Sequence, residues 1–128
     1  LVELMESSDF VSLHISLTPE TRHLIDARAI SRMKRDAILI NTARGDVVDQ
    51  AALIEALRAG WIAGAGLDVY QNEPRISRDF FDLPNVVLLP HIGSATESTR
   101  RKMAETAAAN VIAVLRGEKP LTPVNLAD

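Results

Sequence analysis

The chain has 128 residues, of which 47% are hydrophobic and 24% are charged, and its formal net charge is −3. These values are typical of one globular domain or part of one, and the slight acidity gives no reason to expect nucleic acid or a membrane surface as a partner. Cysteine is absent, which excludes disulfides, thiolate metal ligands and a cysteine nucleophile.

The first third of the chain contains helix and strand signals in alternation. Residues 1–6 resemble the end of a helix without an N-cap, and the chain starts with leucine, so we expect a piece of a longer protein. Residues 10–15 predict a strand. Thr18 before a proline predicts a helix start, and Asp26 predicts the cap of a second short helix that ends near residue 33.

The middle of the chain continues this alternation. Residues 37–41 are nearly all apolar, which is typical of a strand covered on both faces. Asp49 and Gly60 are suitable cap residues for a helix over residues 50–59. Residues 62–69 predict a third strand, although two glycines weaken its propensity.

The last third predicts one more strand, over residues 85–90, and one long helix. Residues 94–97, Ser-Ala-Thr-Glu, match a capping box that opens this helix, and Gly117 ends it. Strands that alternate with helices favour right-handed crossovers and a parallel sheet. The sequence therefore predicts about half of a doubly wound α/β domain, with about four strands and flanking helices.

Polar residues follow three of the predicted strands at their C-terminal ends. They are Thr42, Ala43 and Arg44 after the second strand, Asp68 and Glu73 after the third, and His91 after the fourth. Parallel strands end at the same edge of a sheet, and open α/β sheets bind ligands at that edge. We therefore expect these residues to lie near one another at a binding site.

Arg44, Glu73 and His91 are the candidate catalytic residues. Arg44 lies between two small residues, and its guanidinium can bind a carboxylate through two parallel hydrogen bonds. His91 can donate or accept a proton near neutral pH, and Glu73 beside it would keep it protonated. The alternative is structural: a surface arginine at a strand end, a structural histidine and a solvated acid.

The remaining polar residues support weaker expectations. Asp68 is costly to bury without a partner, so it faces a ligand or serves the structure. Gly93 and Ser94, at a helix start, offer backbone N–H groups to an anion. His14 is expected near the core and His23 on an exposed helix face. The spacing of the histidines does not match metal ligands, so no metal site is predicted.

Five segments in order closely resemble the D-isomer-specific 2-hydroxyacid dehydrogenases. They are residues 9–21, 41–45 (Asn-Thr-Ala-Arg-Gly), 64–69 (Gly-Ala-Gly-Leu-Asp-Val), 73–74 (Glu-Pro) and 90–94 (Pro-His-Ile-Gly-Ser). The resemblance extends over nearly the whole chain. It implies a partial Rossmann-like fold and the reversible reduction of a small 2-keto acid to a D-2-hydroxy acid, with NAD or NADP as cofactor.

The resemblance also implies a role for each candidate residue. Arg44 would hold the substrate carboxylate, His91 would protonate the developing alkoxide, and Glu73 would keep His91 charged and oriented. The implied cofactor contacts are Thr42, Ala43, Arg44, Asp68, His91, Gly93 and Ser94. Ser16 stands where the family often has proline.

Part of the family's pattern does not occur in this chain. There is no G-x-G-x-x-G loop, so residues 1–120 would be the C-terminal half of a dinucleotide-binding domain. Residues 121–128 would form an extended tail that leads back to an absent substrate domain. We expect the isolated segment to bind NAD(H) weakly and to be inactive. The sequence does not identify the particular 2-keto acid. It also does not distinguish NAD from NADP as the cofactor.

Two other functions fit the same residues. A dinucleotide-binding protein similar to the transcriptional corepressors that resemble this family would use the fold without catalysis. A protein-interaction module would pair through the exposed edge of the first strand. We prefer the enzyme, and we expect a cytoplasmic homodimer that binds neither nucleic acid nor membrane.

Overall fold

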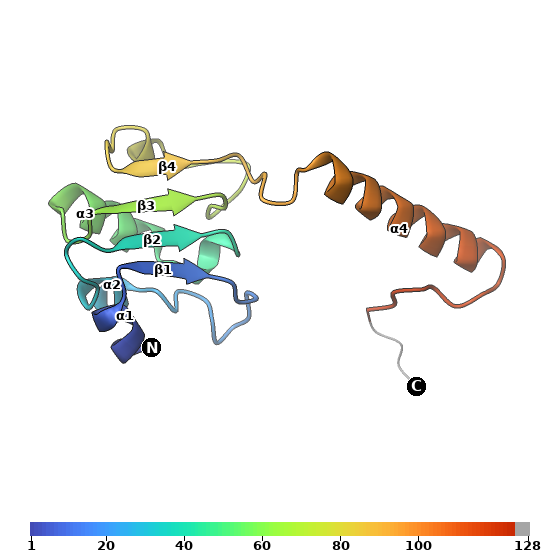
Figure 1. Cartoon of the computed structure of the whole chain (residues 1–128), viewed down its shortest axis with the longest axis horizontal. Coiled ribbons are helices and arrows are strands. Elements are labelled where there is room, and N and C mark those ends of the chain that lie inside the picture. The colour runs from blue at the N-terminus through green and yellow to red at the C-terminus, as the bar shows by residue number, and fades with distance from the viewer. Residues whose placement is uncertain (125–128) are drawn as a thin grey trace. The chain divides into compact units, whose positions relative to one another are not determined.

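The computed structural model describes residues 1–124 and consists of alternating helices and strands (Figure 1). In chain order the elements are α1 (Val2–Ser7), β1 (Phe10–Leu13), α2 (Ala27–Ser31), β2 (Ile38–Asn41), the 3-10 turn η1 (Gly45–Val47), α3 (Gln50–Ala59), β3 (Gly64–Leu67), the 3-10 turn η2 (Arg78–Phe80), β4 (Val86–Leu88) and α4 (Glu97–Leu115). The chain divides into two compact units, Leu1–Ile92 and a second that begins at Gly93. Each unit is described by itself.

The four strands form one parallel sheet in the order β1-β2-β3-β4 (Figure 1). One row of the sheet pairs Val11 with Leu39, Leu39 with Ala65, and Ala65 with Val86. Each connection between neighbouring strands returns the chain to the same edge, so all four strands end together. The predicted fold class, a partial Rossmann-like parallel sheet with flanking helices, is confirmed.

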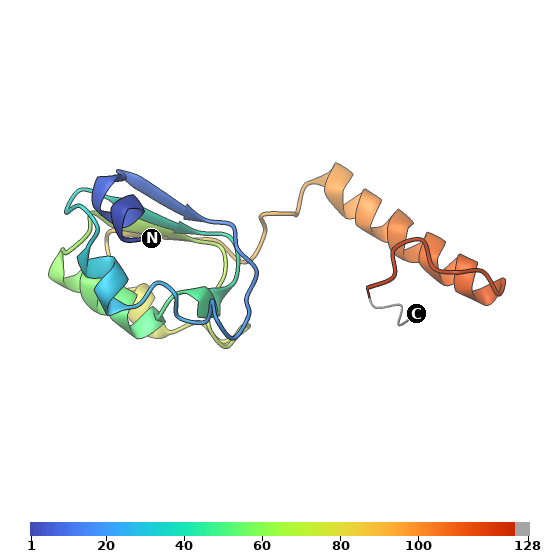
Figure 2. The same cartoon turned by 90° about the horizontal axis from the view of Figure 1, so that it is seen from below.

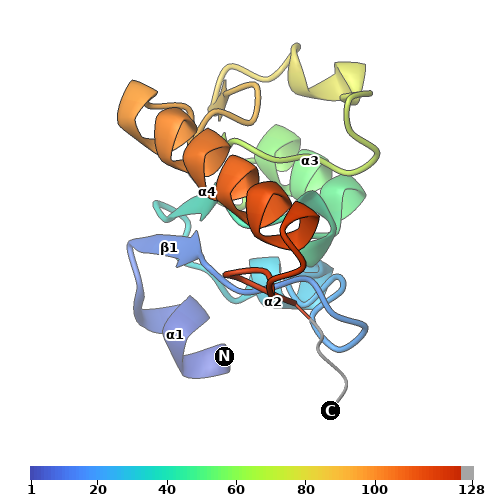
Figure 3. The same ribbon diagram turned by 90° about the vertical axis from the view of Figure 1, so that its right-hand side faces the viewer.

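Within the first unit, α2 and α3 pack against one face of the sheet (Figure 2), and α1 lies next to the β1 edge (Figures 1 and 3). Burial alternates along β1, where Val11 is 3% exposed and Phe10 is 66% exposed. This period of two places every second side chain on the helix-covered face. The core lies between that face and the two helices.

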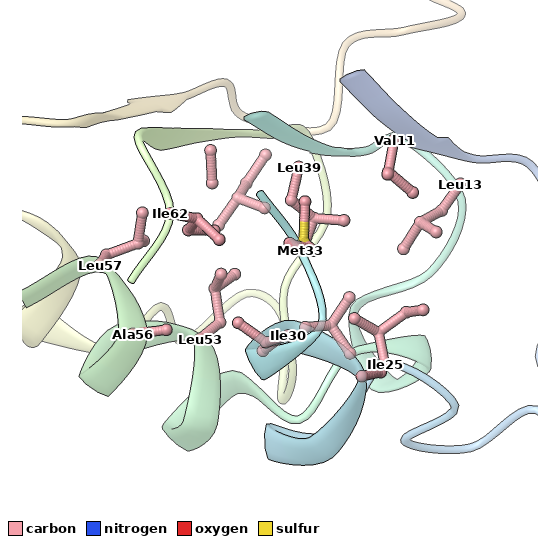
Figure 4. Close-up of a cluster of buried hydrophobic side chains, with 14 of the residues drawn as sticks. Val11, Leu13, Ile25, Ile30, Met33, Leu39, Leu53, Ala56, Leu57 and Ile62 are labelled. Atoms are coloured by element: carbon pink, nitrogen blue, oxygen red, sulfur yellow. The ribbon is translucent and has the colours of Figure 1, made fainter. Parts of the chain in front are cut away.

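Most core side chains are aliphatic and come from the sheet, from α2 and α3 and from the segments next to them (Figure 4), and the aromatic rings of Tyr70 and Phe80 also belong to the core. Leu39 and Ile30 are completely buried, and Leu53 is 1% exposed. Removing a buried aliphatic side chain of this size costs roughly 2–5 kcal/mol. The strand ends, and the loops that follow them, are therefore held by a well-packed layer.

Three of the predicted helix caps are confirmed. The Asp26 carboxylate accepts a hydrogen bond from the Ala29 N–H at 2.8 Å. The Asp49 carboxylate accepts from two N–H groups in the first turn of α3. Gly60 ends α3 in the left-handed conformation, with a φ of 67°, which glycine adopts at low cost.

Two predicted helix starts are wrong. No helix begins at Thr18, because the hydroxyls of Thr18 and Thr21 close a turn with the backbone, and the Thr21 hydroxyl donates to the Ser16 carbonyl at 2.8 Å. The long helix α4 is capped by Thr96, whose hydroxyl accepts from the Thr99 N–H, so the capping box at residues 94–97 does not form.

The other differences concern the ends of elements. The strands are shorter than predicted, and β3 covers only Gly64–Leu67 of residues 62–69. Of the predicted tail, residues 121–124 form no helix or strand, and residues 125–128 lie outside the described residues. Among residues 1–124, no helix has both the length and the apolar character that crossing a bilayer requires.

Candidate active site

The predicted site residues of the first unit follow the C-terminal ends of three neighbouring strands (Figure 1). Arg44 comes three residues after the end of β2, Asp68 directly after β3, and His91 three residues after β4. Glu73 lies in the turn after β3. Since the strands are parallel, all four residues belong to the same edge of the sheet.

His91 and Glu73 form a direct pair. The His91 Nδ1–H donates to Glu73 Oε2 at 2.7 Å, and Glu73 Oε1 accepts from the Tyr70 N–H at 2.8 Å. Both carboxylate oxygens are therefore engaged, and the ring is held through one nitrogen. His91 has a φ of 56°, a left-handed conformation that is uncommon for histidine and often occurs at functional sites.

The pairing favours the ionised form of the carboxyl group. Burial alone would raise the pKa of Glu73, but the hydrogen bonds from His91 and from the Tyr70 N–H outweigh it, and the charge of His91 acts in the same direction. The pKa of Glu73 is thus below its ordinary value of 4.5. At neutral pH Glu73 is therefore a carboxylate, and its Oε2 orients the imidazole of His91 through Nδ1.

Asp68 holds the segment that carries His91. Its carboxylate is 3% exposed, and Oδ1 accepts from the Ile92 N–H at 2.7 Å. A hydrogen bond from a backbone N–H to a carboxylate is strong because the acceptor is charged. This contact is structural. The predicted contact between Asp68 and a cofactor stays a prediction.

The loop that contains Thr42, Ala43 and Arg44 is shaped by Asn41, a residue that the sequence analysis missed. Asn41 is 1% exposed; its Oδ1 accepts from the Ala43 N–H, and its Nδ2 donates to the Arg44 carbonyl, both at 3.0 Å. A buried asparagine at the end of an apolar strand is the signal that could have revealed it, because such a side chain needs hydrogen-bond partners.

Arg44 itself is exposed and has few partners. Its guanidinium donates to the Ala43 carbonyl at 2.6 Å. Among the described residues, no carboxylate lies within ion-pair distance of it. An exposed guanidinium without an acidic partner is able to bind an incoming carboxylate or phosphate.

A hollow of about 410 Å³ lies beside Arg44, at the ends of β1 and β2. Its lining residues are His14, Ile15, Ser16, Leu17, Thr42, Ala43 and Arg44. The expectation that His14 is a near-core residue is wrong: its ring is exposed and pairs with the Ser12 hydroxyl at 2.8 Å. In β1 the side chain at an even position faces away from the helices, and His14 continues that alternation.

Three further expectations concern residues that make none of the contacts described above. His23 is exposed, as predicted, but it lies in a turn rather than a helix. Gly93 and Ser94 belong to the second unit, so their predicted cofactor contact stays a prediction. Among residues 1–124, no group of three or more histidine, aspartate or glutamate side chains could hold a metal ion.

An open parallel sheet with a polar hollow and a paired acid and imidazole at its carboxyl edge defines an α/β ligand-binding domain. The sequence profile described as "D-isomer specific 2-hydroxyacid dehydrogenase, NAD binding domain" matches residues 1–93. The chain therefore belongs to this family, and the resemblance stated from the sequence is confirmed.

Known proteins extend the comparison. The glyoxylate reductase of Thermococcus litoralis is 57% identical over 122 residues, which are 95% of this chain and 37% of that protein. A crystal structure of a protein from Thermus thermophilus has a TM-score of 0.91 and 52% identity, over 97% of this chain and 40% of that one. The crystal structure of the NADPH-dependent glyoxylate/hydroxypyruvate reductase of Sinorhizobium meliloti, in complex with NADP and malonate, has a TM-score of 0.90 and 40% identity. The match covers 96% of this chain and 39% of that one. This chain thus spans no more than about two fifths of these relatives.

Proposed function

We propose that this chain supplies the substrate-binding and proton-transfer residues of an NAD(P)-dependent reductase that converts a 2-keto acid to a D-2-hydroxy acid. The observation that carries the proposal is the His91–Glu73 pair, at 2.7 Å, on the same sheet edge as the exposed Arg44. Glyoxylate and hydroxypyruvate are the proposed substrates, because they are the substrates in the names of the similar reductases.

The chemistry requires a carboxylate clamp and a proton donor. Arg44 binds the carboxylate of the keto acid through its guanidinium. When bound, the reduced nicotinamide supplies the hydride. His91 donates the proton from Nε2, the ring nitrogen not used by Glu73, to the carbonyl oxygen as it becomes an alkoxide. In the oxidation of the hydroxy acid, the same nitrogen accepts the proton.

The residues around the hollow fit the polar part of a dinucleotide. Thr42 and Ala43 line the hollow at the end of β2, Thr42 is exposed, and the lining of the 410 Å³ hollow is rich in polar atoms. We infer that these residues, together with Arg44, Asp68 and His91, contact the cofactor, and we infer the same contact for Gly93 and Ser94. Both NAD and NADP remain candidates, because the profile is that of an NAD-binding domain and a relative holds NADP.

We further infer the organisation of the whole protein. Residues 1–120 form the C-terminal half of the dinucleotide-binding domain, and residues 121–128 lead to a substrate domain, because the similar reductases are more than twice as long as this chain. A cytoplasmic location is supported by the absence of cysteine, which fits a reducing compartment. For the 128-residue chain by itself, a homodimer is also proposed, because β1 is an edge strand of its sheet.

The test is a segment exchange. In the exchange enzyme, this chain replaces the matching segment of the Thermococcus litoralis reductase. We expect NADH or NADPH oxidation that depends on glyoxylate or hydroxypyruvate, and loss of most turnover when His91 is replaced. An exchange enzyme that folds and binds NAD(P)H, but reduces no 2-keto acid, would reject the proposal in favour of a dinucleotide-binding protein without catalysis.

The isolated chain provides a second measurement. NADH titrated into the 128-residue chain should show weak binding and no turnover, because the chain has no G-x-G-x-x-G loop for the pyrophosphate. Saturation at low micromolar NADH would contradict this expectation.

A further inference from the structure

The loop that carries Arg44 and the turn that carries Glu73 touch backbone to backbone at Gly45. A Cβ atom added to Gly45 would overlap the carbonyl group of Tyr70 and the nitrogen of Gln71. The φ of Gly45 is not among the positive values of the described residues, so this position needs glycine for space and not for conformation. Two segments that are distant in sequence are in van der Waals contact there without an intervening side chain.

Hydrogen bonds from Gln71 reinforce the contact from the side of α3. The Gln71 N–H donates to Gln50 Oε1 at 3.2 Å, and its side-chain amide donates to the Val48 carbonyl at 3.3 Å. The same amide group donates to His23 Nε2 at 2.7 Å. The turn after β3 is therefore fastened to the segment that follows Arg44.

Tyr70 connects the contact at Gly45 to the His91–Glu73 pair. Its N–H donates to Glu73 Oε1 at 2.8 Å. Its hydroxyl is shared between the Leu89 carbonyl at 2.7 Å and the Leu67 carbonyl at 3.0 Å, which joins the end of β3 to the chain just after β4. Burial raises the pKa of Tyr70, so the hydroxyl remains a donor. The ring is 6% exposed and packs edge-on against Phe80, with centroids 6.3 Å apart.

We propose that Gly45 is a positioning residue, which fixes the separation between the Arg44 guanidinium and the His91–Glu73 pair. The inference rests on the proposed function. The carboxylate and the keto group of the substrate are on adjacent carbons. The Arg44 guanidinium and the His91 ring must therefore lie at a defined distance and orientation from each other. A displacement of about 1 Å in such a site can cost about 10²-fold in rate.

The variant that tests this is Gly45→Ala, with Gly60→Ala as the matched control. Each adds one methyl group to a glycine, at the start of η1 for Gly45 and at the C-terminal end of α3 for Gly60. Gly60 has a φ of 67° and nothing within 4 Å of the added Cβ, so its replacement strains the backbone without touching the site. A mere loss of stability affects both variants, whereas a loss of positioning affects only Gly45→Ala.

The first readout uses the 128-residue chain and does not need activity. Carbon-13 NMR follows the Glu73 carboxyl through its titration. In Gly45→Ala the methyl group displaces the Tyr70–Gln71 backbone and weakens the Tyr70 N–H bond to Glu73, so the pKa of Glu73 rises toward 4.5. In Gly60→Ala it stays at the wild-type value. An unchanged pKa of Glu73 in folded Gly45→Ala would overturn the proposal.

The second readout is kinetic and uses the exchange enzyme. Gly45→Ala should lower kcat by about 10²-fold and change the KM for glyoxylate by less than about threefold, because Arg44 still binds the carboxylate while the proton donor is displaced. Gly60→Ala should retain kcat. If the unmodified exchange enzyme is inactive, the proposed function fails, and the titration of Glu73 still decides the role of Gly45.

A third variant decides the case in which Gly45→Ala does not fold. Gln71→Met removes the side-chain bonds to Val48 and His23 without adding bulk at Gly45. It should shift the pKa of Glu73 in the same direction by a smaller amount and lower kcat a few-fold. A folded Gln71→Met protein with the pKa of Glu73 and the kcat of the wild type would overturn the proposal.

Discussion

The two halves of the candidate site differ in how strongly neighbouring groups hold their side chains. On the β2 side, the Arg44 guanidinium is exposed and donates only to the neighbouring Ala43 carbonyl among the contacts of the described residues. On the β3 and β4 side, His91 and Glu73 bind each other at 2.7 Å, and Glu73 is held further by Tyr70. The group proposed to bind the substrate carboxylate has no acidic partner among the described residues, and the groups proposed to transfer a proton are oriented without a bound ligand.

The difference fits the role that is proposed for each group. A guanidinium with an internal carboxylate partner would have to break that pair before it could bind a substrate carboxylate, which would weaken binding. A histidine that donates a proton gains from an orienting carboxylate, because ring rotation and the wrong tautomer are excluded in advance. The loop of Arg44 is ordered instead through Asn41, which leaves the guanidinium itself available.

The strongest test of this comparison replaces the proton donor. In the exchange enzyme, His91→Asn should lower kcat by about 10²–10⁴-fold, the range of general acid–base catalysis. Asparagine tolerates the left-handed backbone of His91, whose φ is 56°. The matched control is His23→Asn, at a φ of 52°, which should change kcat by no more than a few-fold. Equal losses in the two variants would show that backbone strain, not proton transfer, causes the effect.

Replacement of Arg44, which is proposed to bind the substrate carboxylate, should have the next largest effect on catalysis. Arg44→Lys keeps the charge but loses the two parallel hydrogen bonds, so kcat/KM for glyoxylate should fall about 10–100-fold, as expected for about 1.5–3 kcal/mol of charged hydrogen bonding. Binding of NADH, measured by its fluorescence, should change far less than the KM of the keto acid. An unchanged kcat/KM in Arg44→Lys would show that Arg44 does not bind the substrate.

Much of the fold could be predicted from local signals. Asp26, Asp49 and Gly60 cap or end helices as predicted, because a cap depends on the chemistry of a few neighbouring residues. The parallel sheet followed from the alternation of apolar runs and helices. The juxtaposition of Glu73 and His91, eighteen residues apart, followed from the topology of the sheet and not from their spacing.

What the sequence analysis missed depends on contacts between distant segments. The tight approach at Gly45 requires the position of Tyr70, which nothing near Gly45 in the sequence indicates. The turn at Thr18 forms because Thr21 competes for the same backbone groups, so a local cap signal was misleading. His14 is expected in or near the core, whereas the alternation in β1 places it on the exposed side.

A stability variant separates the site from the scaffold that supports it. Asp49→Ala removes the carboxylate that accepts two N–H bonds at the start of α3. The free energy of unfolding of the 128-residue chain should fall by about 1 kcal/mol. In the exchange enzyme, kcat at a temperature well below unfolding should stay within about twofold of the unmodified enzyme, because the cap contacts neither Arg44 nor His91. A large loss of kcat would mean that the cap positions the site.

The smallest expected effect concerns acid stability and tests the orienting pair directly. The pKa of Glu73 is lowered in the folded protein, so its stabilisation is present above 4.5 and is lost as the pH falls through the folded-state value. At neutral pH, Glu73→Gln should therefore reduce the free energy of unfolding by about 0.2–1 kcal/mol, the range of solvent-exposed ion pairs. The difference between variant and wild type should vanish in strong acid, where Glu73 is protonated. Urea unfolding of both proteins across this pH range measures it, and a difference that is independent of pH would show that the carboxylate charge does not hold His91.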